Sequence, residues 1–391
     1  MKWASTISED ETLTRAAEES VRAVRDQLDG LAPDLAVVFL SPHHREIHDA
    51  LVDLFANPLG GGLLVGCSAG GVIGGGREVE NRPGLSLTAA VLPDVELTPL
   101  HLETEALPSP EADAEAWESL VGVAAGKSPH FVLLPDPLTF DADRLLRGLD
   151  VAFPKSTKVG GLASGGAGAG QHTLILGNET FQSGLVGVAM SGNIAVDTIV
   201  AQGCRPIGEP MFVTRCMEHL LFELDGRPAR EIVAELYAGL EKRDKDLMLT
   251  SLFLGLVMVD ARSEYRQGDF LIRNILGADP DSGGLAVGAV LRKNQVVQFH
   301  LRDAQTSAED LDQLLALHER RPAPRGSLLF SCLGRGAHLY GRPDHDSSSF
   351  RRHLGEVPLG GFFCNGEIGP VKGTTFLHGY TSSFALFRPR T

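Results

Sequence analysis

The apolar positions of the chain follow two patterns, one with the spacing of an amphipathic helix and one of short continuous runs. The helical pattern begins after Ser8 and the acidic residues that follow it, and it runs from Leu13 to Leu28. We expect this N-terminal amphipathic helix to occupy residues 1–32. The continuous pattern covers residues 35–40, where a β-branched run between two prolines predicts a buried strand.

The next segments extend this alternation and then repeat it. An apolar face from Ile47 to Phe55 predicts a second helix, and residues 63–65 predict a strand that ends in a glycine turn. The order strand, helix, glycine turn and strand occurs again further along. The predicted elements are a helix starting at Pro110, a strand at residues 131–134, a helix capped by Asp141, a glycine turn at Gly160, and strands at residues 173–176 and 184–190. This recurrence indicates an internal duplication between residues 33 and 225.

A break at Asp225 and Gly226, followed by Pro228 at a helix start, predicts a domain boundary. Beyond it we expect strands at residues 252–259, 285–291, 295–299, 327–332 and 380–387, a helix with a capping box of Ser307 and Asp310, a short helix at residues 350–354, and a third glycine turn at Gly360 and Gly361. The predicted fold class is therefore α/β with two domains, residues 33–225 and 226–391. Duplicated strand–helix–glycine turn–strand units would form mixed β-sheets covered by helices.

Charge and cysteine content restrict the function classes. The formal net charge is −15 and the isoelectric point is near 5.3, which disfavours a nucleic-acid or anionic-membrane partner. The five cysteines include no C-x-x-C pair, a usage typical of reduced thiols in the cytoplasm. No apolar run is long enough for a membrane span, and the N-terminus has no secretory pattern. We expect a cytoplasmic protein.

The first glycine turn offers candidate nucleophiles. Gly66 to Gly70 fit the G-x-S-x-G pattern with Ser68 as the nucleophile, but that motif must continue into a helix, and the glycines between residues 71 and 76 disfavour one. Cys67 and Cys364 both lie at strand ends, where a thiolate can act as a nucleophile or a thiol can simply pack as a small apolar group. A Cys/Ser hydrolase is therefore one alternative function.

The sequence predicts no metal site and no cofactor. His44 and His48 are four residues apart on a predicted helix, but no third ligand accompanies them at a useful spacing. Neither a P-loop nor a G-x-G-x-x-G fingerprint is present. The segment Asp344-His345-Asp346 is interpreted as a hydrophilic loop.

The richest polar set lies in the last third of the chain, at predicted strand ends. Arg335 can hold a ligand carboxylate with two hydrogen bonds, Glu367 can receive an ammonium group, and Asn365 can fix the orientation. These roles suit an amino acid or another small zwitterion. In the alternative interpretation, Arg335 and Glu367 pair with each other or cap turns.

These motifs resemble a known family. Residues 66–73 with Gly76, Arg77 and Glu78 resemble the FIST N domain. Residues 331–336, 360–370 and 378–381 resemble the FIST C domain. The resemblance implies a sensory module for F-box and intracellular signal transduction, proposed to bind small ligands such as amino acids, with no catalysis. No F-box or other output region is expected in this chain, so signalling would need a protein partner of unknown identity.

The leading hypothesis is a non-catalytic intracellular sensory protein that binds a small polar ligand, such as an amino acid, between its glycine turns. A protein-interaction scaffold is the alternative, and the hydrolase is the second alternative. The residues expected at the ligand site are Cys67, Ser68, Arg77, Glu78, Ser164, Arg335, Cys364, Asn365, Glu367, His378 and Thr381.

Overall fold

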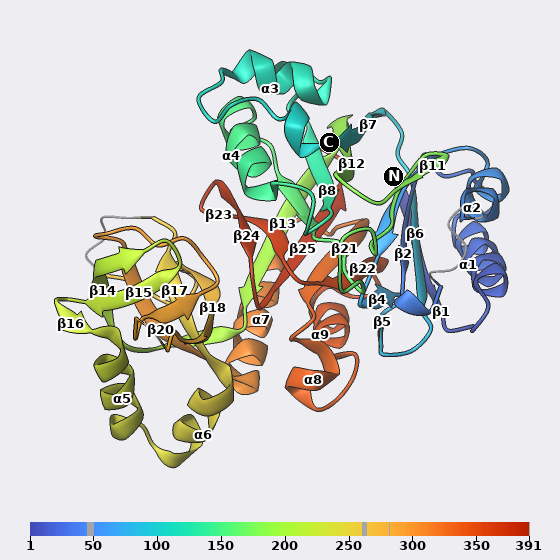
Figure 1. Ribbon diagram of the computed structural model, residues 1–391. Coiled ribbons are helices and arrows are strands. Elements are labelled where there is room, and N and C mark those ends of the chain that lie inside the picture. The colour runs from blue at the N-terminus through green and yellow to red at the C-terminus, as the bar shows by residue number, and fades with distance from the viewer. Residues whose placement is uncertain (45–50, 260–263, 281, 391) are drawn as a thin grey trace. The chain divides into compact units, whose positions relative to one another are not determined.

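The computed structural model describes residues 1–44, 51–259, 264–280 and 282–390 (Figure 1). The chain forms two compact units. One consists of Met1–Val200 together with Asp312–Thr391, and the other, here called the barrel unit, consists of Ala201–Leu311. Ile47 and His48 of the second predicted helix lie outside the described residues.

The larger unit contains three copies of one arrangement of strands and helices. The first copy comprises β1 (Lys2–Ser8), α1 (Leu13–Gln27), β2 (Leu35–Leu40), α2 (Leu51–Leu59), β3 (Leu63–Ser68), β4 (Gly71–Gly74), β5 (Arg77–Glu80) and β6 (Leu85–Val91). The second comprises β7 (Val95–Leu102), α3 (Ala114–Val121), β8 (His130–Pro135), α4 (Ala142–Ala152), β9 (Lys158–Gly161), β10 (Leu174–Leu176), β11 (Glu179–Phe181) and β12 (Leu185–Gly192).

The third copy is interrupted in sequence by the barrel unit. It comprises β13 (Ala195–Gln202), α7 (Ala304–His318), β21 (Gly326–Cys332), α8 (Gly336–Tyr340), α9 (His345–Leu354), β22 (Leu359–Cys364), β23 (Glu367–Val371), β24 (Thr374–His378) and β25 (Thr381–Arg388). Short 3₁₀ turns are η1 (Pro42–His44), η2 (Thr104–Ala106) and η3 (Ala125–Lys127).

Each copy supplies one parallel strand pair, and three six-stranded sheets are built around these pairs. The strand orders are β1-β6-β2-β3-β10-β11, β7-β12-β8-β9-β23-β24 and β13-β25-β21-β22-β4-β5. The hairpin that follows each glycine turn therefore pairs with the sheet of another copy. This exchange links the three copies to one another through backbone hydrogen bonds.

A glycine occupies the same register position in all three parallel pairs. Gly66 lies opposite Val38, Gly160 opposite Leu133, and Gly361 opposite Leu329. On its other side each glycine pairs with an isoleucine of the incoming hairpin, namely Ile175, Ile368 and Ile73 in the same order. A Cβ atom on any of these glycines would lie between 1.8 and 2.1 Å from the carbonyl oxygen of the opposite residue. The close approach of the two backbones therefore excludes a side chain.

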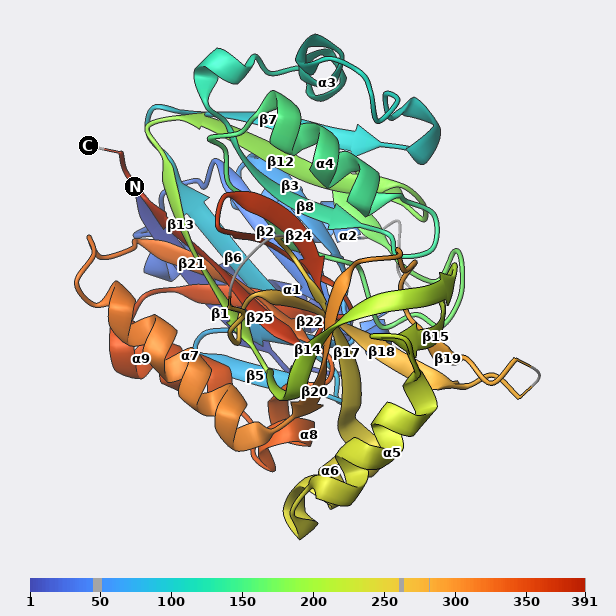
Figure 2. The ribbon, with the colours of Figure 1, turned by 90° about the vertical axis from the view of Figure 1, so that its left-hand side faces the viewer.

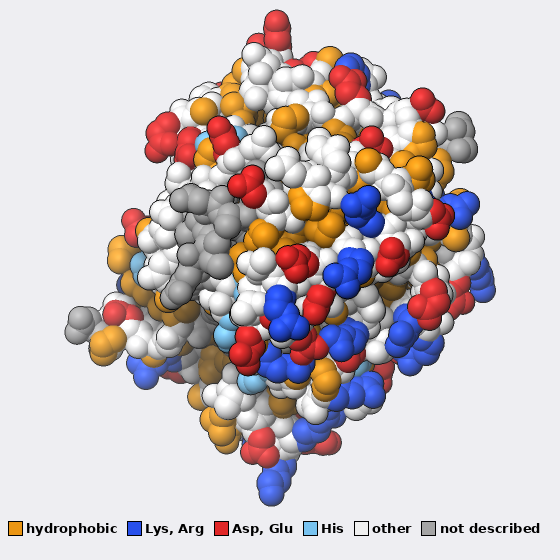
Figure 3. Space-filling view, turned by 90° about the vertical axis from the view of Figure 1, so that its right-hand side faces the viewer, with side chains coloured by type: hydrophobic (Ala, Val, Ile, Leu, Met, Phe, Trp, Pro, Cys, Tyr) orange, Lys and Arg blue, Asp and Glu red, His pale blue; other side chains and the backbone are white. Residues whose placement is uncertain are grey.

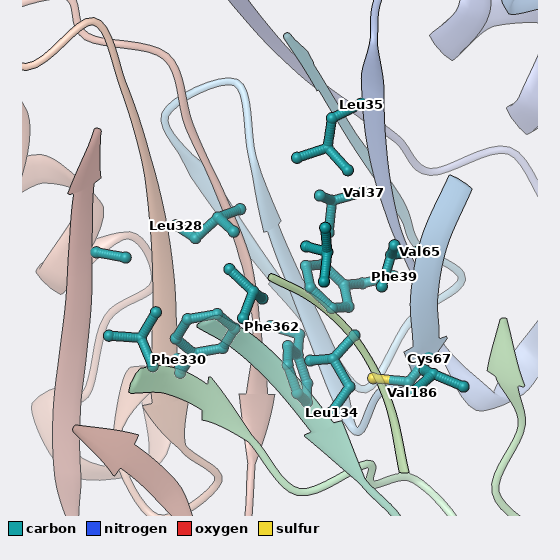
Figure 4. Packing of buried hydrophobic residues seen from close by; sticks show 14 of the residues in the cluster. Leu35, Val37, Phe39, Val65, Cys67, Leu134, Val186, Leu328, Phe330 and Phe362 are labelled. Atoms are coloured by element: carbon teal, nitrogen blue, oxygen red, sulfur yellow. The ribbon is translucent and has the colours of Figure 1, made fainter. Parts of the chain in front are cut away.

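The three sheets share one apolar core. Phe39 of the first sheet stacks on Phe362 of the third, with 4.5 Å between ring centroids, and Phe330 meets Phe362 edge to face at 5.8 Å. Figure 4 shows Leu134 and Val186 of the second sheet beside them. The outer faces are covered by helices, α1 and α2 on the first sheet (Figure 1) and α3 and α4 on the second (Figure 2).

The barrel unit has its own core and its own sheet. Its elements are β14 (Cys204–Met217), β15 (Leu220–Leu224), β16 (Arg227–Pro228), α5 (Ala229–Gly239), α6 (Lys242–Ser251), β17 (Leu252–Val257), β18 (Phe270–Ala278), β19 (Leu285–Val287) and β20 (Val296–Arg302). The strand order is β14-β20-β17-β18-β19-β15-β16, and the additional pairing of β14 with β15 closes six strands into a barrel. Its buried residues, such as Leu254, Val297 and Phe299, form a separate cluster.

The predicted order of strands and helices is largely confirmed, but three helix starts are wrong. Ser8 ends strand β1, which the sequence analysis does not predict, and α1 begins at Leu13 after Thr12. The helix expected at Pro110 begins at Ala114, where the Asp113 side chain accepts a hydrogen bond from the backbone N–H of Ala116. The helix attributed to a Ser307 capping box begins at Ala304. The predicted Asp141 cap is confirmed by its hydrogen bond from the Arg144 N–H.

Within the described residues no helix is both long and apolar enough to cross a membrane. On the face that carries α1 and α2, acidic and basic side chains lie side by side (Figure 3).

Candidate functional site

The predicted site residues fall into several places in the larger unit, and the most polar of these is a buried network around Asp346. The Arg335 side chain is fully buried and donates two hydrogen bonds to Asp346, from Nε to Oδ2 at 2.9 Å and from Nη2 to Oδ1 at 3.2 Å. Nη2 also donates to the Tyr340 hydroxyl at 2.6 Å. Asp346 accepts further hydrogen bonds from the hydroxyl of Ser382 at 2.5 Å and from Nδ1 of His345 at 2.9 Å.

This network keeps Arg335 and Asp346 ionised. Burial alone would lower the pKa of Arg335, but the Asp346 carboxylate raises it above its ordinary value. Burial alone would raise the pKa of Asp346, but the Arg335 guanidinium holds it well below its usual range. The sequence analysis expects Arg335 to bind a ligand carboxylate. In the structure Arg335 binds the carboxylate of Asp346 instead. Arg335 and Glu367 do not pair with each other.

Strand β5 carries two carboxylates to the starts of helices α8 and α9. Glu78 Oε1 accepts a hydrogen bond from the Ser347 N–H at 2.7 Å, and Glu80 Oε1 accepts one from the Ala337 N–H at 2.8 Å. Both carboxylates thus satisfy N–H groups of the first turns of these helices. Burial, followed by the negative charge of Asp346, raises the pKa of Glu78 to about 8.

Three polar atoms around this network are buried without a hydrogen-bond partner among the described residues. They are Nη1 of Arg335, Oε2 of Glu78 and the hydroxyl of Ser347. The Ser347 side chain nevertheless lies close enough to the Glu78 carboxylate to oppose the rise of its pKa, so both residues belong to one internal polar network.

A cavity of about 260 Å³ lies against this network, and Ser347 forms part of its wall. Arg351, one turn further along α9, lines the same cavity, as do Gly75 and Gly76 at the tip of the β4–β5 hairpin and Glu356 after α9. Both glycines have a positive φ, and a Cβ atom at position 76 would lie 3.6 Å from the Arg351 guanidinium. The cavity wall therefore combines one cation and one carboxylate.

A second group of predicted residues lies where the three glycine turns meet. The Ser164 hydroxyl accepts a hydrogen bond from the Gly70 N–H at 2.8 Å and donates one to the Phe363 carbonyl at 2.6 Å. The Ser164 N–H donates to the Ser68 carbonyl at 3.1 Å. Ser164 thus connects the turns of all three copies and has a structural role there.

The candidate nucleophiles lack the features that a hydrolase needs. Burial raises the pKa of the Cys67 and Cys364 thiols well above their ordinary value, and the nearby Glu367 carboxylate adds to this effect at Cys364. The Ser68 hydroxyl accepts a hydrogen bond from the Thr173 N–H. The chain after Ser68 continues into strand β4 rather than into a helix. Among the described residues, no hydrogen bond of these three side chains involves a histidine.

A third group surrounds Glu367 at the start of β23. Its carboxylate accepts hydrogen bonds from the N–H groups of Gly366 and Thr381, both at 3.1 Å. Burial outweighs these bonds and raises the pKa of Glu367 to about 8. His378 pairs with Glu367 across the β23–β24 hairpin, and its Nε2 lies 3.0 Å from the Gly369 carbonyl oxygen.

Two predicted residues lie on the surface. Asn365 is exposed at the turn between β22 and β23. The half-exposed Arg77 forms an ion pair with Glu9. Neither touches the network around Asp346 in the described contacts.

Sequence reasoning missed several residues that the structure brings together. Asp346 and His345 belong to the segment interpreted as a hydrophilic loop, yet both are buried in the first turn of α9. The buried pair of Asp136 and His172, with 2.7 Å between Oδ2 and Nδ1, was also not predicted. The sequence contains a weak signal for Asp346. It is followed by three serines in the first turns of α9, which offer few apolar side chains for packing, so polar contacts are expected to position this part of the helix.

The comparisons with known proteins identify the family of the chain. The chain matches the FIST N domain over residues 34–227 and the FIST C domain over residues 229–370, which defines it as a two-module α/β protein of this type. It is 38% identical over 388 residues to the uncharacterized protein Rv0628c of Mycobacterium tuberculosis, a match covering 97% of this chain and 98% of the relative. The chain belongs to the FIST family, which is implicated in signal transduction.

Two further relatives differ in coverage. The uncharacterized protein Mb0898c of Mycobacterium bovis is 36% identical over 377 residues, or 95% of both chains. The F-box/LRR-repeat protein At5g63520 of Arabidopsis thaliana is 28% identical over 134 residues, which covers 30% of this chain and 25% of that protein. The boundary between the two matched modules, near residue 228, falls inside the barrel unit, so the modules and the compact units divide the chain differently.

Proposed function

We propose that this protein is an intracellular, non-catalytic sensory protein that binds a small polar ligand, an amino acid, in the cavity beside Ser347. The observation that carries the proposal is the presence of one cation, Arg351, and one carboxylate, Glu356, in the wall of that cavity. Opposite charges in one small cavity are complementary to the two charged groups of an amino acid.

The charged residues of the cavity suit a zwitterion. The Arg351 guanidinium can bind a carboxylate with two parallel hydrogen bonds, and Glu356 can accept from an ammonium group. Neither side chain has an ion pair among the described residues. The volume of about 260 Å³ is just below the usual range of small-molecule pockets, which suits a ligand as small as one amino acid.

In this proposal Glu78 and Arg335, which the sequence analysis expects at the ligand site, do not contact the ligand but position helix α9. Glu78 and Arg335 hold the first turn of α9 through Ser347 and Asp346. Substituting Arg335 would leave Asp346 as an unpaired buried charge, a change that typically costs about 3–5 kcal/mol of stability. Loss of binding in such a variant would therefore not locate a ligand.

The test is isothermal titration of the purified protein with single amino acids and small carboxylates. We expect a ligand whose affinity falls about tenfold or more in Arg351→Ala and is also reduced in Glu356→Gln, because a charge-assisted hydrogen bond contributes roughly 1.5–3 kcal/mol. Arg352→Ala is the matched control, since this neighbouring arginine pairs with Asp312 and does not line the cavity. Absence of binding at millimolar concentration, or binding that both cavity variants leave unchanged, would contradict the proposal.

The protein-interaction alternative has a specific observation in its favour. Among the described residues, seven of the twelve exposed large hydrophobic side chains belong to the barrel unit, which is less than a third of the chain. Concentrated apolar exposure of this kind is typical of surfaces that bind other proteins.

A further inference from the structure

The barrel unit contains a second cavity with a different chemical character. It has a volume of about 450 Å³ and is lined by Pro210, Met211, Phe212, Tyr265, Val296, Glu209 and Glu264. Both charged residues in this described lining are glutamates. The remaining lining residues present aromatic rings, a thioether and aliphatic groups.

An irregularity of strand β14 lies in the wall of this cavity. The pairing of β14 with β20 shifts register between Ile207 and Met211, so the intervening residues leave the regular ladder. Such bulges commonly occur next to binding sites, because they redirect side chains. Here the bulge carries Glu209 to the cavity, and Phe212 follows with 55% of its surface exposed.

We infer that this cavity binds an arginine or lysine side chain of a partner peptide. Aromatic faces attract guanidinium and ammonium groups through their quadrupole, and a carboxylate beside the ring supplies the hydrogen-bond acceptor. Among the described residues, the only cation that pairs with either glutamate is Arg266, whose guanidinium lies 3.4 Å from the Glu264 carboxylate. Both side chains of this pair are exposed, so the pair is weak. Glu209 has no ion pair among the described residues.

The chemistry of the cavity wall favours a peptide as the source of the cation. The lining also contains Pro210, Met211 and Val296, which are apolar and suit contacts with the neighbouring residues of a peptide. The net charge of −15 also increases the rate of encounter with a basic segment. A free amine would use the carboxylates and rings but none of this apolar surface.

The test uses fluorescence anisotropy of the full-length protein with a labelled alanine- and leucine-rich peptide that carries arginine. We expect saturable binding that weakens as salt is added. Phe212→Ala should reduce the affinity about tenfold, and Glu209→Gln and Glu264→Gln should each reduce it about three- to tenfold. These residues are at the surface, so the variants should fold. Glu241→Gln, an exposed carboxylate of the same unit outside the cavity lining, is the matched control and should bind like the unmodified protein.

Three results would overturn the inference. Equal binding of a peptide in which glutamate replaces arginine would exclude cation recognition. An affinity unchanged in Phe212→Ala and both glutamine variants would exclude this cavity. N-acetyl-arginine amide that binds as tightly as the peptide would exclude a peptide as the preferred partner.

Discussion

At the scale of single residues, the protein buries carboxylates in two different states. Asp346 faces the Arg335 guanidinium and stays ionised, whereas Glu78 and Glu367 lie in sites where burial raises their pKa to about 8. The difference follows from the neighbours, because Glu367 receives only neutral donors, two N–H groups and the Cys364 thiol, and has no direct ion pair. The stability of the protein should therefore depend on pH in a range where most carboxylates do not titrate.

We predict that Glu367 makes the folded protein less stable as the pH rises. Between the ordinary carboxyl value of 4.5 and about 8, the folded protein holds a proton that the unfolded chain has released, so the free energy of unfolding decreases across this window. The decrease from this one group is up to about 4 kcal/mol. Glu367→Gln should flatten the profile, because the amide is neutral in both states.

Urea unfolding at several pH values between about 5 and about 8 measures this slope. Glu78 contributes to the same window, so the double variant with Glu78→Gln should flatten the profile further. Glu179→Gln, at an exposed strand position, is the control and should keep the original slope. A slope that survives in the double variant would show that these two carboxylates are ionised at neutral pH.

The residue scale also shows what sequence reasoning can and cannot supply. The sequence analysis selects Arg335 and Glu367 because strand ends of one sheet can converge on one cleft, and both side chains are buried among polar groups. The partner of Arg335 was not predictable, because a guanidinium can reach any carboxylate that the fold brings near it. Asp346 is eleven positions away and on a different element, so only the packing of α9 against α8, which Arg335 precedes, decides the pair.

At the scale of elements, the glycine turns can be predicted from the sequence, but the pairing of the hairpins that follow them cannot. Strand, helix and glycine recur in the sequence with clear spacing, and all three parallel pairs are present in the structure. The exchange of hairpins between copies depends on contacts between residues far apart in the chain. For example, Ile73 pairs with Gly361, and no local pattern encodes that pairing. Strand β1 was missed because Lys2–Ser8 is a short segment with few large apolar residues.

The repeated glycines lead to a prediction about steric tolerance. In Gly66→Ala the new Cβ atom would lie 2.1 Å from the Val38 carbonyl oxygen and 2.7 Å from its Cγ1 atom. Because a paired strand backbone cannot move far, we expect a loss of about 3 kcal/mol or more in the free energy of unfolding. Gly126→Ala is the matched control, since a Cβ atom there would meet nothing within 4 Å, and it should change stability by about 0.5 kcal/mol or less. Equal urea midpoints for the two variants would refute the steric argument.

At the scale of the whole molecule, the chain leaves the larger unit after Val200, forms the barrel unit and returns at Asp312. The hydrophobic clusters respect this division, since each one described lies within a single unit. Separate cores allow separate unfolding, because a cavity in one core removes packing from that core alone. The two proposed binding sites also belong to different units, the Ser347 cavity to the larger unit and the Phe212 cavity to the barrel unit.

We therefore predict that the two units exchange amide hydrogens independently. Leu254→Ala removes a fully buried side chain from the barrel core and should destabilise that unit by about 2–5 kcal/mol. Leu328→Ala makes the same chemical change in the core shared by the three sheets. In hydrogen-exchange mass spectrometry, Leu254→Ala should accelerate exchange in the strands of the barrel and leave β2, β8 and β21 unchanged, and Leu328→Ala should do the reverse. If either substitution accelerates exchange in both units to the same extent, the molecule unfolds as one cooperative body, and a ligand bound at one cavity would then stabilise the other unit by mass action.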